Sequence, residues 1–242
     1  MKKIVAYVGS RQGKNSKTYY FIKSILDKVI EKNLNINYEI ITANEVNILN
    51  CIGCNKCFET AKCIQDINDD MPILREKLIN SDFVILGSPI YAHNVSGDFK
   101  TFIDRSSYWM HLMPLSGKGS MAITTTFSNG HTTGIDYIGK MLTHFGSKLI
   151  AKYNAATLYP EQLFNKEWFD NTIDILSNEI IKILNSRIET DNNLEQLFLS
   201  LKKTMEYYKK SNIHEGEWTY WEKKGYLSCD NFKEVLNLID EK

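Results

Sequence analysis

Apolar residues along this chain fall into short runs separated by longer stretches of mixed polarity. Five of the runs have the length and bounds of buried strands and end at small or polar turn residues. They cover the ranges 3–9, 37–42, 82–87, 118–126 and 148–158. Since strands buried on both faces lose the alternation of polar and apolar positions, these runs predict a sheet at the centre of the molecule.

The stretches between the runs carry apolar residues three and four positions apart, which is the spacing of an amphipathic helix. They predict helices over the ranges 16–32, 70–79, 98–110, 132–145 and 168–185. Strands that alternate with helices form a parallel sheet covered on both faces, and five strands commonly take the order 2-1-3-4-5. The pattern therefore predicts an α/β chain with a doubly wound, five-stranded parallel sheet.

Residues 187–242 lie outside these five units. Helical spacing recurs at 194–208 and 230–239, and the segment is rich in tyrosine and tryptophan. We expect one domain over residues 1–186 and a helical, aromatic C-terminal extension that packs on this core or on a partner subunit.

Composition narrows the class of protein. The 242 residues include 29 Lys and Arg against 29 Asp and Glu, so the formal net charge is zero and the basic footprint of a nucleic-acid binder is absent. No apolar run approaches the ~20 residues of a membrane span. The first run stops at Gly9 and is followed by Arg11, which does not fit a secretion signal. These features predict a cytoplasmic protein that binds neither nucleic acid nor membrane.

Four of the five cysteines lie within thirteen residues, at Cys51, Cys54, Cys57 and Cys63. In a reducing compartment such a group binds metal, takes part in redox chemistry or stays as free thiols. Thiolates are soft ligands that suit zinc or an iron–sulfur cluster. Structural zinc sites usually separate their ligand pairs by a longer loop, which favours the cluster over zinc.

The loop after the first strand is rich in groups that bind anions. Hydroxyls at Ser10, Ser16 and Thr18 precede or begin a helix, whose first N–H groups are free, and Arg11 and Lys14 add positive charge. The loop matches neither the dinucleotide fingerprint nor the P-loop, so a lone phosphate monoester is the better ligand. The alternative is a plain polar turn in which Ser16 caps the helix.

Two more loops follow the third and fourth strands, and in a parallel sheet they reach the same edge as the first. The loop at 87–97 places Pro89 and Tyr91 before polar residues, so it could lie along a planar ring. The loop at 124–131 ends in Asn129 and Gly130, which would let backbone approach a ring closely. Each could also be an ordinary turn.

Three segments in this order resemble the NAD(P)H-dependent FMN reductase branch of the flavodoxin-like superfamily, over about residues 1–185. They read GSRQGKNSKT, CIGCNKCFETAKC and GSPIYAHNVSGDFKTFIDR. The resemblance implies a flavodoxin-like fold with FMN phosphate on Ser10, Arg11, Asn15, Ser16 and Thr18. It implies ring contacts from Pro89, Ile90, Tyr91, His93 and Asn94, and from Thr125, Thr126, Ser128, Asn129 and Gly130 on the other side. The first loop departs from the common Ser-Pro-Arg pattern, because Arg11 directly follows Ser10.

The resemblance also implies an activity. NAD(P)H would reduce FMN, and electrons would pass to a quinone, a flavin, a nitro or azo compound or a redox protein, in a homodimer or higher homo-oligomer. The chemistry is the flavin's own, so no catalytic side chain is predicted. The cysteine spacing is similar to that of iron-sulfur flavoproteins, which implies a [4Fe-4S] cluster on the four cysteines and a ferredoxin-like partner. Free thiols packed under a turn, and a flavodoxin-like binding module without turnover, remain as alternatives.

Overall fold

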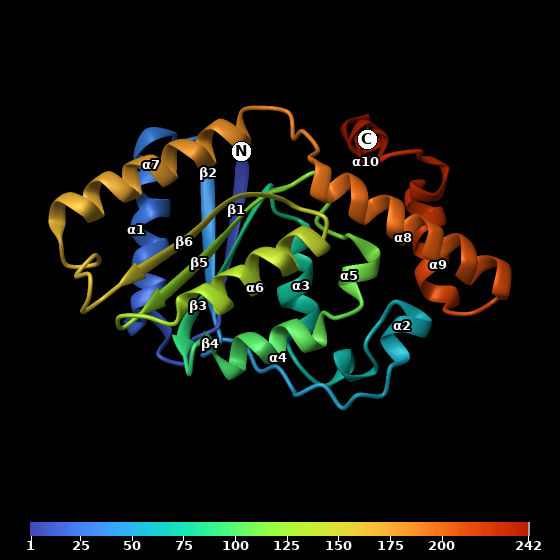
Figure 1. Cartoon of the computed structure of the whole chain (residues 1–242), viewed down its shortest axis with the longest axis horizontal. Helices are drawn as coiled ribbons and strands as arrows, with labels where there is room; N and C mark the ends of the chain where they lie inside the picture. The colour runs from blue at the N-terminus through green and yellow to red at the C-terminus, as the bar shows by residue number, and fades with distance from the viewer. Residues whose placement is uncertain (242) are drawn as a thin grey trace.

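The computed structural model describes residues 1–241 and has a parallel sheet at its centre (Figure 1). Its five long strands lie in the order β2-β1-β3-β5-β6, which confirms the predicted 2-1-3-4-5 arrangement. The strands are β1 (Lys2–Val8), β2 (Ile36–Thr42), β3 (Phe83–Tyr91), β5 (Gly119–Thr126) and β6 (Lys148–Ala156). A two-residue strand, β4 (Asn94–Val95), pairs antiparallel with the end of β3.

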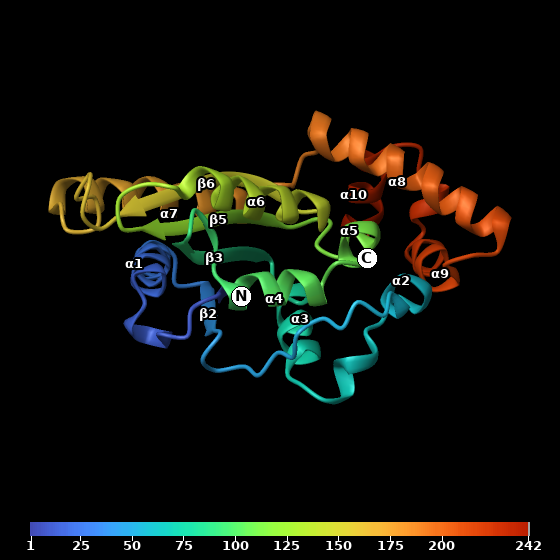
Figure 2. The same ribbon diagram turned by 60° about the horizontal axis from the view of Figure 1, so that its bottom comes forward.

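Helices cover both faces of the sheet, as the two views show (Figures 1 and 2). Helices α1 (Lys17–Lys32) and α7 (Lys166–Leu184) pack on one face. Helices α3 (Met71–Ile79), α4 (Gly97–Arg105) and α6 (His131–His144) pack on the other. Successive strand residues point to opposite faces, so each strand supplies both cores.

The predicted helix at 98–110 is wrong as a single element. Helix α4 ends at Arg105, and a short helix α5 (Trp109–Leu112) begins after a turn. The amide of Ser106 bonds to the carbonyls of Phe102 and Ile103, which closes α4. The turn redirects the chain so that Trp109 enters the core with only 2% of its surface exposed. A pattern of apolar residues alone does not distinguish this turn from a continuing helix.

The long segment between β2 and α3, for which no strand or helix was predicted, contains two short helical pieces. They are α2 (Lys56–Thr60) and a 3₁₀ turn at Ile64–Ile67. Helix α2 lies between Asn55 and Ala61, both with positive φ, which isolates it from the rest of the segment. Three cysteines therefore sit just before or within a single turn of helix, and Cys63 follows it.

The C-terminal extension forms three α-helices and a 3₁₀ turn, which lie at one end of the molecule (Figure 1). Helices α8 (Asn192–Ser211) and α10 (Phe232–Asp240) confirm the two predicted ones, while α9 (Glu215–Lys224) was not predicted. Helix α9 lies directly on α2: a β-carbon on Gly216 would come within 2.2 Å of the backbone of Thr60. The backbone of the extension therefore packs directly against the backbone of the cysteine segment.

Among residues 1–241, no helix combines the length and apolar character needed to cross a bilayer. The longest, α8, has twenty residues but carries charged side chains along its length.

Candidate functional site

The three predicted ligand loops meet at the carboxyl edge of the sheet. The hydroxyl of Ser96 donates to the carbonyl of Gly9, which ties the second loop to the first. The hydroxyls of Thr18 and Thr125 lie 2.6 Å apart in a buried hydrogen bond, which ties the first helix to the third loop. Residues far apart in sequence are thus fixed together at one edge.

The first loop keeps its predicted residues but divides them by exposure. Ser10, Ser16 and Thr18 are buried, whereas Arg11 and Asn15 are exposed. Ser16 is the N-cap of α1, and its side chain makes no capping hydrogen bond in the described residues. The first N–H groups of α1 therefore lack a side-chain cap, as an anion site requires.

Arg11 has a defined partner at the loop. Its Nε donates to a carboxylate oxygen of Asp98, in the first turn of α4, at 2.9 Å. This ion pair is largely exposed, so its contribution to stability is small. It does hold the guanidinium near the loop.

The second loop is a hairpin rather than an irregular loop. Strand β3 continues through Pro89 and Ile90 to Tyr91, and its end pairs with β4. Ala92 and His93 form the turn with φ of 47° and 63°, the left-handed pair that a two-residue hairpin needs. The side chains of Tyr91, His93 and Asn94 are exposed at this tip.

The third loop packs against that hairpin. Thr125 and Thr126 are buried at the end of β5, and the Thr126 hydroxyl donates to the carbonyl of Asn129 at 2.7 Å. Gly130 has φ of 79° and lies so close to His93 that a β-carbon there would be 2.7 Å from the ring. Glycine is needed at this position for both reasons.

An open depression of about 420 Å³ borders the third loop. Ser128 and His131 line it from the loop side, while Asn154 and Gln162 line it from the end of β6. It therefore lies on the opposite side of the third loop from the first and second loops.

Gly9→Ala adds a single methyl group, but we expect it to disturb the contact between the first loop and α4. The added β-carbon would stand 2.5 Å from Cβ and 2.8 Å from Cα of Phe99, so the backbone of the first loop or of α4 must move. We expect a loss of about 1–3 kcal/mol in the free energy of unfolding and weaker binding of the flavin that the resemblance implies. Gly97→Ala is the matched control, because a β-carbon there meets no atom within 4 Å. Equal flavin titrations for the two variants would contradict the expectation.

The four clustered cysteines line one recess. Cys51, Cys54, Cys57 and Cys63 surround it together with Phe58 and Arg105. Burial raises the pKa of the Cys57 thiol, a nearby Ser107 side chain lowers it, and the proximity of the other three cysteines raises it further, with a net upward shift. A cation in the recess would relieve this mutual repulsion of thiolates.

Within residues 1–241, no three His, Cys, Asp or Glu side chains already converge as a ready-made metal site. The recess nevertheless offers four soft donors and a buried guanidinium whose Nε has no hydrogen-bond partner among the described residues. Four thiolate sulfurs suit a soft metal centre such as an iron–sulfur cluster, and free thiols are the alternative.

Three residues at these sites were not predicted as site residues. Ser96 ties the loops, Asp98 holds Arg11, and Arg105 lines the cysteine recess. All three lie in the quoted GSPIYAHNVSGDFKTFIDR segment. A serine that precedes a helix is a detectable signal of an N-cap, but the long-range partners are not visible in the sequence.

The fold and the three joined loops define a flavodoxin-like protein, and comparison with known proteins gives the family. The model of the NADPH-dependent FMN reductase family matches residues 2–156, so the chain belongs to that family.

The curated relatives are iron-sulfur flavoproteins. One from Clostridioides difficile is 27% identical over 224 residues, which is 90% of this chain and 95% of the relative. One from Archaeoglobus fulgidus is 24% identical over 208 residues, covering 84% of this chain and 92% of the relative. One from Methanocaldococcus jannaschii is 30% identical over 138 residues, covering 56% of this chain and 69% of the relative.

Solved structures agree on the fold. An NADH:FMN oxidoreductase gives a TM-score of 0.55 at 19% identity, over 80% of this chain and 94% of that one. An FMN-dependent NADH-azoreductase from Bacillus anthracis gives a TM-score of 0.53 at 10% identity, over 76% of this chain and 100% of that one.

Proposed function

We propose that this chain is an FMN-dependent oxidoreductase that holds its flavin across the carboxyl ends of β1, β3 and β5. The observation that carries the proposal is the joining of the three loops. Buried hydrogen bonds join Ser96 with Gly9 and Thr18 with Thr125, and His93 lies against Gly130. This edge is where ligands bind in open α/β sheets. Membership of the FMN reductase family supports the choice of ligand.

The residues divide the work of binding. Ser10, Ser16 and the uncapped N–H groups of α1 bind the phosphate, and Arg11 adds positive charge above it. The hairpin tip and the third loop hold the ring, with Tyr91 exposed for stacking and Asn129 and Gly130 offering backbone groups to its polar edge. When bound, FMN supplies the exchange of two electrons and a proton between NAD(P)H and an acceptor, for which we propose a small molecule or a redox protein.

The recess lined by the four cysteines lies at the other end of α4 and could hold a second cofactor. We propose that the four cysteines hold a [4Fe-4S] cluster, because all four line one recess and the relatives that span most of this chain are named iron-sulfur flavoproteins. Helix α4 begins beside Gly9 and ends with Arg105 in the recess, so the sites lie about one short helix apart, roughly 13 Å. A cluster held by the four cysteines would let electrons pass between a flavin bound at the sheet edge and a one-electron partner.

Anaerobic purification with flavin, iron and sulfide counted per chain tests both parts. We expect FMN absorption together with a broad iron–sulfur shoulder that bleaches on oxidation. Flavin bands without the shoulder would contradict the proposed cluster and support the FMN reductase alone. A colourless chain that cannot be reconstituted with FMN would contradict the proposal and leave a binding module without turnover.

Cys54→Ser separates the two groups within one chain. We expect the variant to lose iron and sulfide while it keeps FMN, since Cys54 lies in the recess and contributes nothing to the three loops. Cys229→Ser is the matched control, because Cys229 is buried in the C-terminal extension away from the recess. Iron retained in Cys54→Ser at the control's level would rule out this ligand set.

A further inference from the structure

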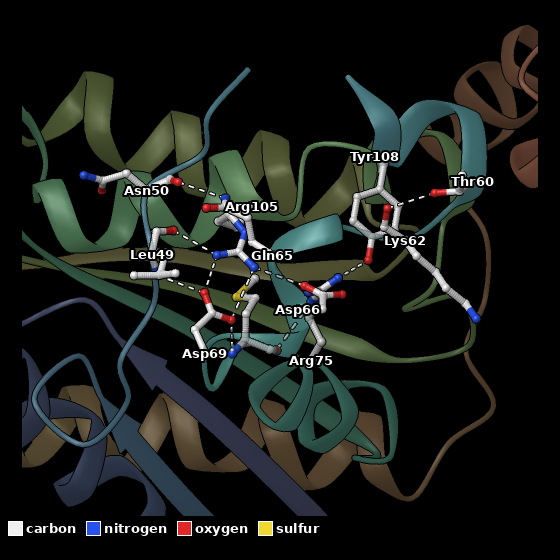
Figure 3. A network of polar contacts seen from close by, with 11 residues as sticks. Leu49, Asn50, Thr60, Lys62, Gln65, Asp66, Asp69, Arg75, Arg105 and Tyr108 are labelled. Carbon is white, nitrogen blue, oxygen red and sulfur yellow. Dashed lines mark hydrogen bonds and ion pairs between the residues drawn. The ribbon is translucent and has the colours of Figure 1, made fainter. Parts of the chain in front are cut away.

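A network of buried charges lies beneath the cysteine segment (Figure 3). The side chains of Arg105 and Asp69 are both fully buried and form an ion pair. Asp66 accepts from both Arg105 and Arg75, and Arg75 also donates to Tyr108. Burying charges this deeply lowers stability unless each charge has a partner, and most of the charged atoms in this network have one.

The network holds both flanks of the cysteine segment. Arg105 Nη1 donates to the carbonyl of Leu49 at 2.9 Å, two residues before Cys51. Asp69 accepts from the amide of Leu49 at 2.9 Å and from the amide of Met71 at 3.1 Å. Asn50 and Gln65 add a direct link between the flanks, from Gln65 Nε2 to the carbonyl of Asn50 at 3.0 Å. The entry and exit of the segment are thus tied to one guanidinium.

The charged state of this pair is strongly favoured. Burial alone would raise the pKa of Asp69, but hydrogen bonds from Arg105 and from the amides of Leu49 and Met71 outweigh it, so the pKa is lowered. Arg105 keeps its charge because a guanidinium does not deprotonate in proteins, and the buried carboxylate of Asp69 pairs with it. A permanent positive charge therefore stands at the wall of the recess.

One donor of this guanidinium is unused. Nε of Arg105 is buried and has no hydrogen-bond partner among the described residues. The other nitrogens are taken by Leu49, Asp69 and Asp66. Arg105 and Cys63 both line the recess. A buried N–H without a partner is rare, and it indicates an acceptor that belongs at that place.

We propose that Arg105 is a positioning residue for the cysteine recess: it fixes the two flanks of the segment and presents its free Nε–H and its charge to the anionic group that the thiolates hold. This rests on the proposed [4Fe-4S] cluster. Nothing in the resemblance to FMN reductases assigns a role to this arginine.

The consequence for the cluster has a definite sign. A nearby positive charge and an N–H donor to sulfur stabilise the more negative, reduced state, and so raise the reduction potential. They also offset the repulsion among four thiolates, and so slow the loss of iron. Removal of partners around a metal site typically costs 10–100-fold in metal affinity.

The test uses the full chain, reconstituted anaerobically with ferrous iron and sulfide. Arg105→Gln removes the charge, and Arg105→Lys keeps the charge but loses the planar donor. Arg75→Lys is the matched control, because Arg75 is also buried and also pairs with Asp66 but does not line the recess. The readouts are the rate of iron release to a chelator and the reduction potential of the cluster followed by its spectrum.

We expect Arg105→Gln to release iron about 10–100-fold faster than the Arg75→Lys control and to have a lower reduction potential. Arg105→Lys should restore most of the potential while still losing iron faster. Circular dichroism of each variant identifies any that fails to fold. If Arg105→Gln does not fold, the rate of iron release from Arg105→Lys tests the proposal instead. A loaded wild-type chain with Arg105 variants that match Arg75→Lys would overturn this inference alone. A wild-type chain that takes up no iron would overturn the cluster and this inference with it, while the flavin site would stand.

Discussion

Trp221→Ala is expected to lower the free energy of unfolding by about 3–5 kcal/mol. Trp221 is fully buried in α9, stacks on Phe198 of α8 at 5.3 Å and meets Tyr226 edge-on at 5.6 Å. Its Nε1 donates to the carbonyl of His111 at 2.8 Å, which fastens the extension to α5. The variant would lose a large packed volume and leave that carbonyl without its donor.

Chemical denaturation followed by circular dichroism measures the loss. Trp221→Phe is the control: it keeps most of the packing and loses the hydrogen bond, for which we expect about 1 kcal/mol. A loss below about 1 kcal/mol in Trp221→Ala would contradict the packing argument.

The same experiment bears on how the chain is divided. Buried residues of the extension, such as Phe198 and Phe232, belong to one continuous core with Tyr7 of β1 and Phe99 of α4. We propose that residues 187–242 unfold together with the sheet rather than as a separate unit. A single transition is the expected result, and two transitions with Trp221→Ala affecting only one of them would contradict it.

The sheet could be predicted from the sequence because its signal is local. Each strand is a run of apolar residues long enough to be read without its neighbours, and the connecting helices fix the parallel direction. The common edge of the three loops follows from that topology, so the candidate flavin residues could be placed together before any contact was known.

The parts that were missed depend on departures from local preference. The hairpin turn uses Ala92 and His93 at positive φ, where Asn-Gly would have been the usual signal. Helix α9 places Trp218, Tyr220 and Trp221 without a clear helical period, because it packs against α2, α5 and α8 on different sides. Arg105 and Asp69 are 36 residues apart in sequence, and no local pattern links them.

Asp69→Asn is expected to be the most damaging single change near the cysteine segment, with a loss of about 3–5 kcal/mol. The substitution keeps the shape of the side chain but leaves the fully buried Arg105 charge without its main partner. Breaking one side of a buried pair costs more than removing both, since the remaining charge is stranded. The double variant Asp69→Asn with Arg105→Met should therefore recover part of the loss.

The pH dependence gives the same pair an independent signature. The pKa of Asp69 is lowered in the folded chain, so its ion pair stabilises the fold above about pH 4. As the pH falls below about 4, the carboxyl of Asp69 becomes protonated in the unfolded chain but not yet in the folded chain, so the unfolded chain binds more protons and the contribution decreases. The contribution is lost once the pH has fallen through the lowered pKa and the folded carboxyl is protonated too. The difference in unfolding free energy between wild type and Asp69→Asn should be largest at neutral pH and shrink towards acid. A difference that stays constant from pH 7 to about pH 3 would show that Asp69 acts through its shape and hydrogen bonds rather than through its charge.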